Sequence, residues 1–116
     1  MSALGADVQR YVDAIVPAQR PLFDRLHALI VGAFPTVEVV LSYDMPTYVV
    51  GERRLHVAAW KQWVSLYGWD EDRDGGFVAR HPELSSGRGT LKLRPSAARE
   101  IGDDELLDLI RGALAA

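Results

Sequence analysis

The side chains best suited to binding chemistry gather in one stretch of the sequence, residues 39–67, VVLSYDMPTYVVGERRLHVAAWKQWVSLY. This stretch holds two of the three tryptophans, three of the four tyrosines and His56. Tryptophan and tyrosine pair a large apolar ring with a polar tip, which suits ligand pockets and protein interfaces. Histidine titrates near neutral pH and can act as a general acid or base. No Asp or Glu of the neighbouring runs is placed to orient His56 and no nucleophile pairs with it, so we expect binding rather than catalysis.

Two runs of β-branched, aromatic and small residues, 55–60 and 63–67, are typical of β-strands. The two residues between them predict a hairpin with a tight loop, in which directly opposed residues share one face of the sheet. One face, which we expect to be the core face, then carries Leu55, Val57, Ala59, Val64 and Leu66. The other face carries three opposed pairs, which are Trp60 with Trp63, Ala58 with Ser65, and His56 with Tyr67.

The turn before these runs predicts the same division of faces. Gly51 can adopt the positive φ that a tight turn needs at this point. Tyr48 and Val50 then lie on the core face, whereas Thr47 and Val49 lie on the face of the histidine.

The rest of the chain supplies helices to cover the core face. Apolar residues recur at helical spacing in residues 8–15, 22–33 and 103–114. Residues 38–43 and 90–94 read as the first and last strands. We therefore expect an α+β fold as a single domain over residues 1–116. It would be a two-layer sandwich, with N- and C-terminal helices packed on one face of a five-stranded, mainly antiparallel sheet.

A long connection at residues 68–89 separates the last aromatic strand from the final strand, and residues 76–84 within it are compatible with a short helix. Loops of this length in small domains are usually functional or mobile. Because no helix is predicted to cover the aromatic face, that face needs an explanation. Three alternatives remain open. The connection folds over the face as a second small core, the face binds a small molecule or ion, or the face is a protein interface such as a homodimer.

The ligand-binding alternative defines a set of candidate residues. Lys92 alternates with Leu91 and Leu93, so it points away from the helices and could contact a phosphate or carboxylate at the rim of the aromatic face. The candidate ligand-binding residues are Ser42, Tyr43, Met45, Thr47, His56, Trp60, Trp63, Tyr67 and Lys92.

An acidic segment at residues 70–75, DEDRDG, matches the opening of a calcium-binding loop and makes Asp70, Asp72 and Asp74 candidate metal ligands. The twelfth position of such a loop would be His81, where calcium loops need a bidentate Glu. The three histidines of the chain also lack a recognisable metal spacing. We therefore favour a solvated acidic turn over a metal site.

Composition excludes several classes of protein. The chain has 116 residues, enough for one core, and has no cysteine for disulfides, thiol catalysis or Cys-based zinc sites. No apolar run approaches the length of a membrane span, and the first residues lack a secretory signal, so we expect a cytoplasmic protein. The net charge of −3 makes nucleic acid an unlikely partner.

Several motifs, taken in order, resemble the YdhG-like domain family. They are Ser42-Tyr43-Asp44-Met45-Pro46, a Gly-containing turn, Ala58-Ala59-Trp60-Lys61, Leu66-Tyr67 and Gly89-Thr90-Leu91. Most members are domains of unknown function, and the family includes a frataxin-like bacterial iron chaperone. The resemblance implies a similar α+β sandwich and a binding role, with iron as a cofactor by analogy alone.

Two features depart from that family. Asp44 stands where relatives usually have Gly. Frataxin-type iron binding uses a dense acidic ridge, whereas the first two helices predicted here offer Asp7, Asp13 and Asp24. Because of these two departures, the binding of a small molecule is the first expectation and an iron chaperone is the alternative.

Overall fold

An antiparallel sheet of five strands, in the order β1-β2-β3-β4-β5, forms the centre of the fold. The structure is a computed structural model and describes residues 4–87 and 89–115. The strands are β1 (Glu38–Ser42), β2 (Met45–Val50), β3 (Arg53–Ala59), β4 (Val64–Tyr67) and β5 (Thr90–Leu93). The helices are α1 (Ala6–Asp13), α2 (Arg20–Ala33), α3 (Phe77–Arg80), α4 (Pro95–Ala98) and α5 (Asp103–Leu114).

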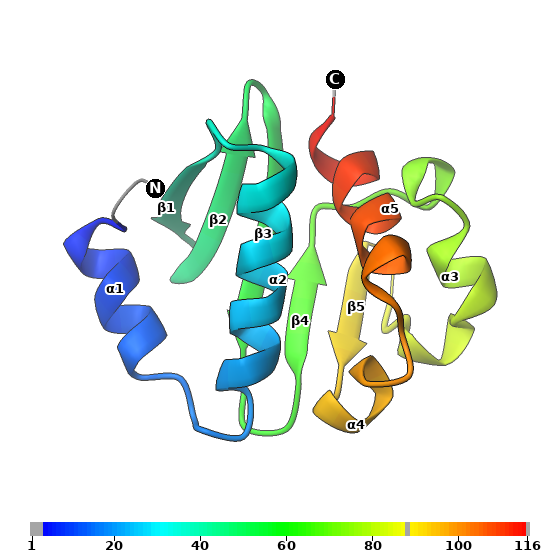
Figure 1. The fold of residues 1–116 in the computed structure, drawn as a ribbon, viewed down its shortest axis with the longest axis horizontal. Helices are drawn as coiled ribbons and strands as arrows, with labels where there is room; N and C mark the ends of the chain where they lie inside the picture. Colours follow the sequence, from blue (N-terminus) through cyan, green and yellow to red (C-terminus); the bar gives the residue numbers. More distant parts are fainter. Residues whose placement is uncertain (1–3, 88, 116) are drawn as a thin grey trace.

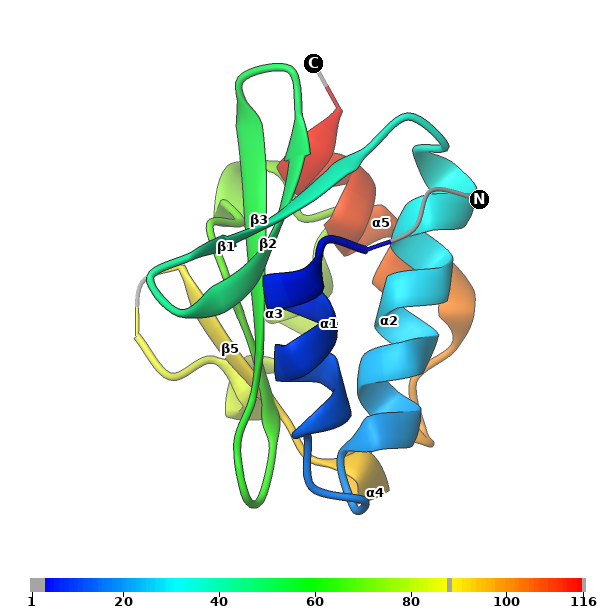
Figure 2. The same cartoon turned by 90° about the vertical axis from the view of Figure 1, so that its left-hand side faces the viewer.

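The three long helices, α1, α2 and α5, lie on one face of the sheet (Figure 1). Helix α1 contacts β1 and β2, whereas α2 and α5 contact each other and β3. Figure 2 views the sheet from its edge, with these helices on the right and a face that carries none of the described helices on the left. We call this second surface the open face. The predicted α+β fold, with N- and C-terminal helices packed on one side of a five-stranded antiparallel sheet, is confirmed.

The register between β3 and β4 is the one that the sequence predicts. His56 pairs with Tyr67 and Ala58 with Ser65, and the N–H of Trp60 donates to the carbonyl of Trp63 at 2.9 Å. The predicted core face is covered by helices, and its central side chains have no exposed surface. They are Leu55, Val57, Val64 and Leu66.

The turn between β1 and β2 consists of Tyr43 and Asp44, which have positive φ values of 53° and 59°. Two consecutive residues with positive φ make the turn type that matches the twist of a two-residue hairpin. Asp tolerates this conformation better than most residues, and Gly tolerates it best. The first strand consequently ends at Ser42, one residue before the predicted end, and Tyr43 projects from the turn.

The connection at residues 68–89 packs beside α5 and adds to the main core. Its large apolar side chains, Trp69, Phe77 and Leu84, are buried in the same cluster as the helices. After the short helix α3, which is shorter than the predicted one, Ser85 pairs with Leu91 at the outer edge of β5. These side chains therefore do not form a second core on the open face. Residues Pro95–Ala98 form the short helix α4.

The side chain of Tyr11 in α1 bonds to the backbone of β3 beyond the residues of β3 that pair with β2. The hydroxyl of Tyr11 accepts a hydrogen bond from the backbone N–H of Ala59 at 2.9 Å and lies 3.4 Å from the carbonyl oxygen of the same residue. This contact fastens α1 to the sheet. None of the described helices is long and apolar enough to cross a membrane.

Candidate functional site

His56 lies on the open face, in the middle of the sheet, between Thr47 of β2 and Tyr67 of β4. Alternation along the strands places these three side chains on the side opposite the helices. Gly68 follows β4 with a φ of 94°, and a Cβ there would meet the carbonyl oxygen of Arg54 at 2.8 Å and the His56 ring at 3.7 Å. A glycine is therefore needed for the chain to leave β4 close beside His56.

The hydroxyl of Thr47 fixes the imidazole of His56. Its oxygen lies 2.7 Å from Nδ1 of His56 and 3.1 Å from the carbonyl oxygen of Met45. A hydroxyl has one hydrogen, and the Met45 carbonyl can only accept, so the hydroxyl donates to the carbonyl and accepts from Nδ1–H. The neutral ring then carries its proton on Nδ1, and Nε2 is left as a hydrogen-bond acceptor. Thr47 therefore orients the imidazole of His56, and β2, β3 and β4 contain no Asp or Glu that could do so.

The surroundings of His56 favour its neutral form. Partial burial lowers the pKa of the imidazole below its ordinary value of 6.5, and the positive charge of Arg54 lowers it further. Burial acts by removing water from the charged form, and Arg54 acts by repulsion between like charges. At neutral pH the ring therefore presents the unprotonated Nε2 as an acceptor.

Two tyrosines flank this histidine. The ring of Tyr43 approaches His56 edge-on, with 5.9 Å between the ring centroids and 72° between the planes. The side chain of Tyr43 is 84% exposed, because the β1–β2 turn holds it outside the sheet. Tyr67, paired with His56, is half-buried. The imidazole and the two rings form an aromatic surface on which Nε2 of His56 bonds to none of the described residues. We call Tyr43, Thr47, His56 and Tyr67 the His56 site.

Trp63 lies further along the open face, beneath two cations. The ammonium nitrogen of Lys92 is 4.5 Å from the centroid of the indole, and the guanidinium carbon of Arg94 is 5.2 Å from it. Both distances are within the range of cation–π attraction. Between this group and the His56 site lies Ser65, whose fully buried hydroxyl has no hydrogen-bond partner among the described residues.

Trp60 stands apart from the other predicted site residues. It is 49% exposed and borders a hollow of about 260 Å³ that it shares with Tyr11, Ile15 and Val16. Trp60 therefore borders the last turn of α1 and the residues that follow it. Ser42 and Met45 pair with each other at the β1–β2 turn, and Met45 contributes its carbonyl oxygen to the Thr47 hydrogen bond.

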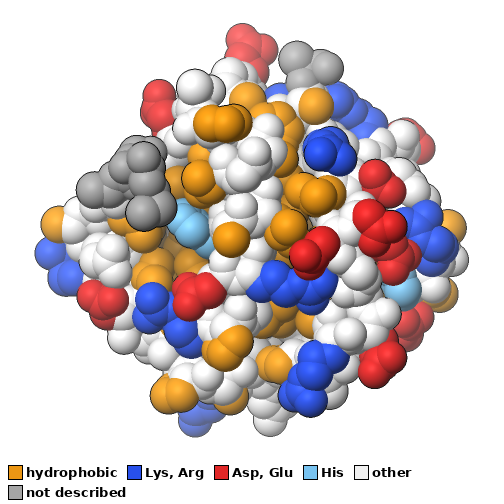
Figure 3. Space-filling view, in the orientation of Figure 1, with side chains coloured by type: hydrophobic (Ala, Val, Ile, Leu, Met, Phe, Trp, Pro, Cys, Tyr) orange, Lys and Arg blue, Asp and Glu red, His pale blue; other side chains and the backbone are white. Residues whose placement is uncertain are grey.

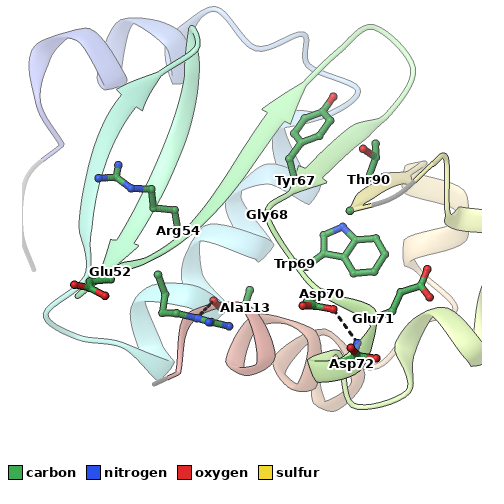
Figure 4. Close-up of a pocket in the computed structure, with 12 residues that line it drawn as sticks. Glu52, Arg54, Tyr67, Gly68, Trp69, Asp70, Glu71, Asp72, Thr90 and Ala113 are labelled. Carbon is green, nitrogen blue, oxygen red and sulfur yellow. Dashed lines mark hydrogen bonds between the residues drawn. The ribbon is translucent and has the colours of Figure 1, made fainter.

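A cleft of about 920 Å³ adjoins the His56 site at the end of the sheet (Figure 4). Arg54 and Glu52 come from β3 and from the turn before it, Tyr67 closes β4, and Trp69 and Asp70 follow β4. Tyr67 therefore belongs to both the open face and the cleft. Arg54 is not among the predicted site residues, although its alternation with His56 along β3 would have placed it on the same face.

The predicted acidic candidates serve local structure. Asp70 accepts the backbone N–H of Asp72 at 3.0 Å, and the two carboxylate oxygens of buried Asp74 accept the N–H groups of Gly76 and Val78 at 2.9 Å. The bond of Asp70 caps the short 3-10 helix Glu71–Arg73, and the two bonds of Asp74 hold the start of α3. Within residues 4–87 and 89–115, no three His, Asp or Glu side chains are placed to hold a metal ion.

The histidines likewise have separate partners. Nδ1 of His27 lies 2.8 Å from the hydroxyl of Tyr48, and Nε2 of His81 lies 3.1 Å from a carboxylate oxygen of Glu105. Both pairs are on the helix side of the sheet, away from His56.

The structure thus brings together four of the predicted site residues, Tyr43, Thr47, His56 and Tyr67, and places Trp63 with Lys92 in a neighbouring group. Trp60 bonds to the carbonyl of Trp63 through its backbone N–H and borders a different hollow, which it shares with Tyr11. Comparison of the chain with models of protein families, with curated proteins and with solved structures gave no match, so the resemblance to YdhG-like domains stays a prediction.

Proposed function

We propose that this protein binds a small molecule on the open face, at the His56 site. The observation that carries this proposal is Nε2 of His56, which bonds to none of the described residues and lies on a face that carries none of the described helices. Thr47 fixes the tautomer, and partial burial keeps the ring neutral, so that Nε2 is available to a hydrogen-bond donor of a ligand. The rings of Tyr43 and Tyr67 supply apolar surface beside this acceptor.

This arrangement has the composition of a ligand site. Such sites combine apolar and aromatic surface with a few polar groups in fixed positions. Here Nε2 of His56 is the fixed acceptor, and the hydroxyl of Tyr67 can donate or accept. The cleft beside Tyr67 provides room for a ligand to extend beyond the sheet.

The proposal is tested by NMR titration of the isotope-labelled protein with a panel of small metabolites. Compounds that bind should shift the imidazole signals of His56 and should bind His56→Gln at least tenfold more weakly. His81→Gln is the matched control, because His81 lies on the helix side and a Gln there retains a side chain that can bond Glu105. Its binding should equal that of the wild type.

Two results would contradict the proposal. In one, no compound of the panel shifts signals of Tyr43, His56 or Tyr67. In the other, compounds bind His56→Gln as tightly as the wild type.

A further inference from the structure

The open face of β3, β4 and β5 carries basic side chains and no acidic ones. The side chains at its alternating positions are Arg54, His56, Ala58, Ser65, Tyr67, Thr90 and Lys92. Arg94 follows directly after β5 and also lies over Trp63. The net charge of the chain is −3, so the charge of this basic surface is opposite in sign to that of the whole chain. Local charge of one sign on a surface attracts ligands of the other sign.

The helix side differs in its charges. Figure 3 shows acidic and basic side chains intermixed there. Three of its arginines form ion pairs of 2.8 to 2.9 Å, namely Arg20 with Asp24, Arg25 with Asp103, and Arg80 with Glu105. On the open face, Arg54, Lys92 and Arg94 form no ion pair with any of the described residues. Their charge is therefore available to a ligand.

Trp63 holds two of these cations close together. The charged groups of Lys92 and Arg94 lie 4.5 Å and 5.2 Å from the centroid of the same ring. Cation–π attraction fixes both groups, so less side-chain freedom is lost when a ligand binds them. Two positive charges near one ring also repel each other, and a negative group bound to both would relieve that repulsion.

We propose that the ligand of the open face carries a carboxylate or phosphate group, and that Lys92 and Arg94, held by Trp63, bind it. The inference rests on the proposed function, because it names the chemical class of ligand for the same face. Lys92 and His56 lie two strands and two residues apart, which is about 12 Å between Cα atoms. A ligand that reaches both is therefore a small organic anion.

The test uses pyrophosphate and citrate as probes of the two anion chemistries, each added at constant ionic strength to the labelled full chain. Either probe should give saturable shifts of the Trp63 indole N–H and of Lys92 signals. The double variant Lys92→Gln/Arg94→Gln should bind at least tenfold more weakly. The matched control is Arg10→Gln/Arg99→Gln, which removes the same charge from exposed positions in α1 and after α4.

The inference is overturned if neither probe shifts these signals more than chloride does, or if the control variant weakens binding as much as the Lys92→Gln/Arg94→Gln variant. Preference for pyrophosphate would identify a phosphate ligand, and preference for citrate a carboxylate ligand.

The metabolite panel separates the two proposals. If uncharged or cationic compounds bind at His56 while both anions fail, this inference fails alone. If the panel also leaves the His56 site unshifted, the proposed function fails.

Discussion

Gly112 of α5 is the position at which the packing of the 68–89 connection can be tested most sharply. A Cβ at Gly112 would overlap the carbonyl oxygen of Arg73 and would lie 3.3 Å from the Cα of Asp74. The obstacle is backbone, which cannot rotate away as the end of a side chain can. Gly32 of α2 is the matched control, because a Cβ there meets nothing within 4 Å.

The two Gly→Ala substitutions should have opposite effects on stability. Alanine is favoured over glycine in helices, and near the end of α2 we expect Gly32→Ala to raise the free energy of unfolding by about 0.5 kcal/mol. In Gly112→Ala this gain is outweighed. Overpacking typically costs about 1–3 kcal/mol of stability. In Gly112→Ala the backbone of Arg73 and Asp74 must move, and this movement disturbs the bonds of Asp74 to the start of α3. We expect a loss of about 2–3 kcal/mol.

Urea denaturation measures both changes, through the midpoint at constant slope. If Gly112→Ala stabilised the protein as Gly32→Ala does, the connection would not lie against α5. The side chains of Trp69 and Phe77 would then be free to pack elsewhere, including on the open face, and the His56 site would be covered.

Three further predictions concern polar groups of the sheet. Tyr11→Phe leaves the backbone N–H of Ala59 without a partner and should lower the free energy of unfolding by about 1–3 kcal/mol in urea denaturation, so an unchanged midpoint would contradict the contact. Ser65→Ala removes a buried hydroxyl that bonds to none of the residues the structure describes, and it should raise the free energy of unfolding by about 1 kcal/mol, whereas a loss of that size would show that the hydroxyl is bonded. NMR titration of His56 should give a pKa below 6.5. The pKa of His56 is lower in the folded than in the unfolded state, so the stability that the neutral ring contributes is full above about pH 6.5 and is lost as the pH falls through the folded-state pKa. The difference in free energy of unfolding between wild type and His56→Gln should therefore change in that pH range.

The sequence predicted which side chains of the central hairpins share a face of the sheet, because the alternation of side chains along a strand is a local property. Leu55 and Val57 alternate with His56, and the short loop after β3 fixes which residues of β4 lie opposite. Once one apolar face must be buried, a shift of the register by a single residue would expose the whole core side of β3. The positions of Thr47 and Tyr67 beside His56 followed from the same rule.

The contacts that the sequence did not reveal join residues far apart in the chain. The hydroxyl of Tyr11 reaches Ala59 across 48 positions, and local spacing along α1 shows only that Tyr11 belongs to an apolar stripe. The docking of the 68–89 connection depends on the missing side chain of Gly112, in a helix that begins after β5 and α4. Trp60 keeps the predicted register, and it also borders a hollow that it shares with Tyr11 of α1. In each case the partner is set by tertiary packing, which local patterns do not encode.

Exposure of the open face to solvent is the quantity on which the proposed site depends most directly. Side-chain NMR relaxation in the presence of a neutral gadolinium chelate measures it for each residue. We predict strong relaxation of the signals of Tyr43 and His56 and little effect on the methyl groups of Val57 and Leu66. Protection of the two rings, with relaxed methyl groups on β3 and β4, would contradict the account.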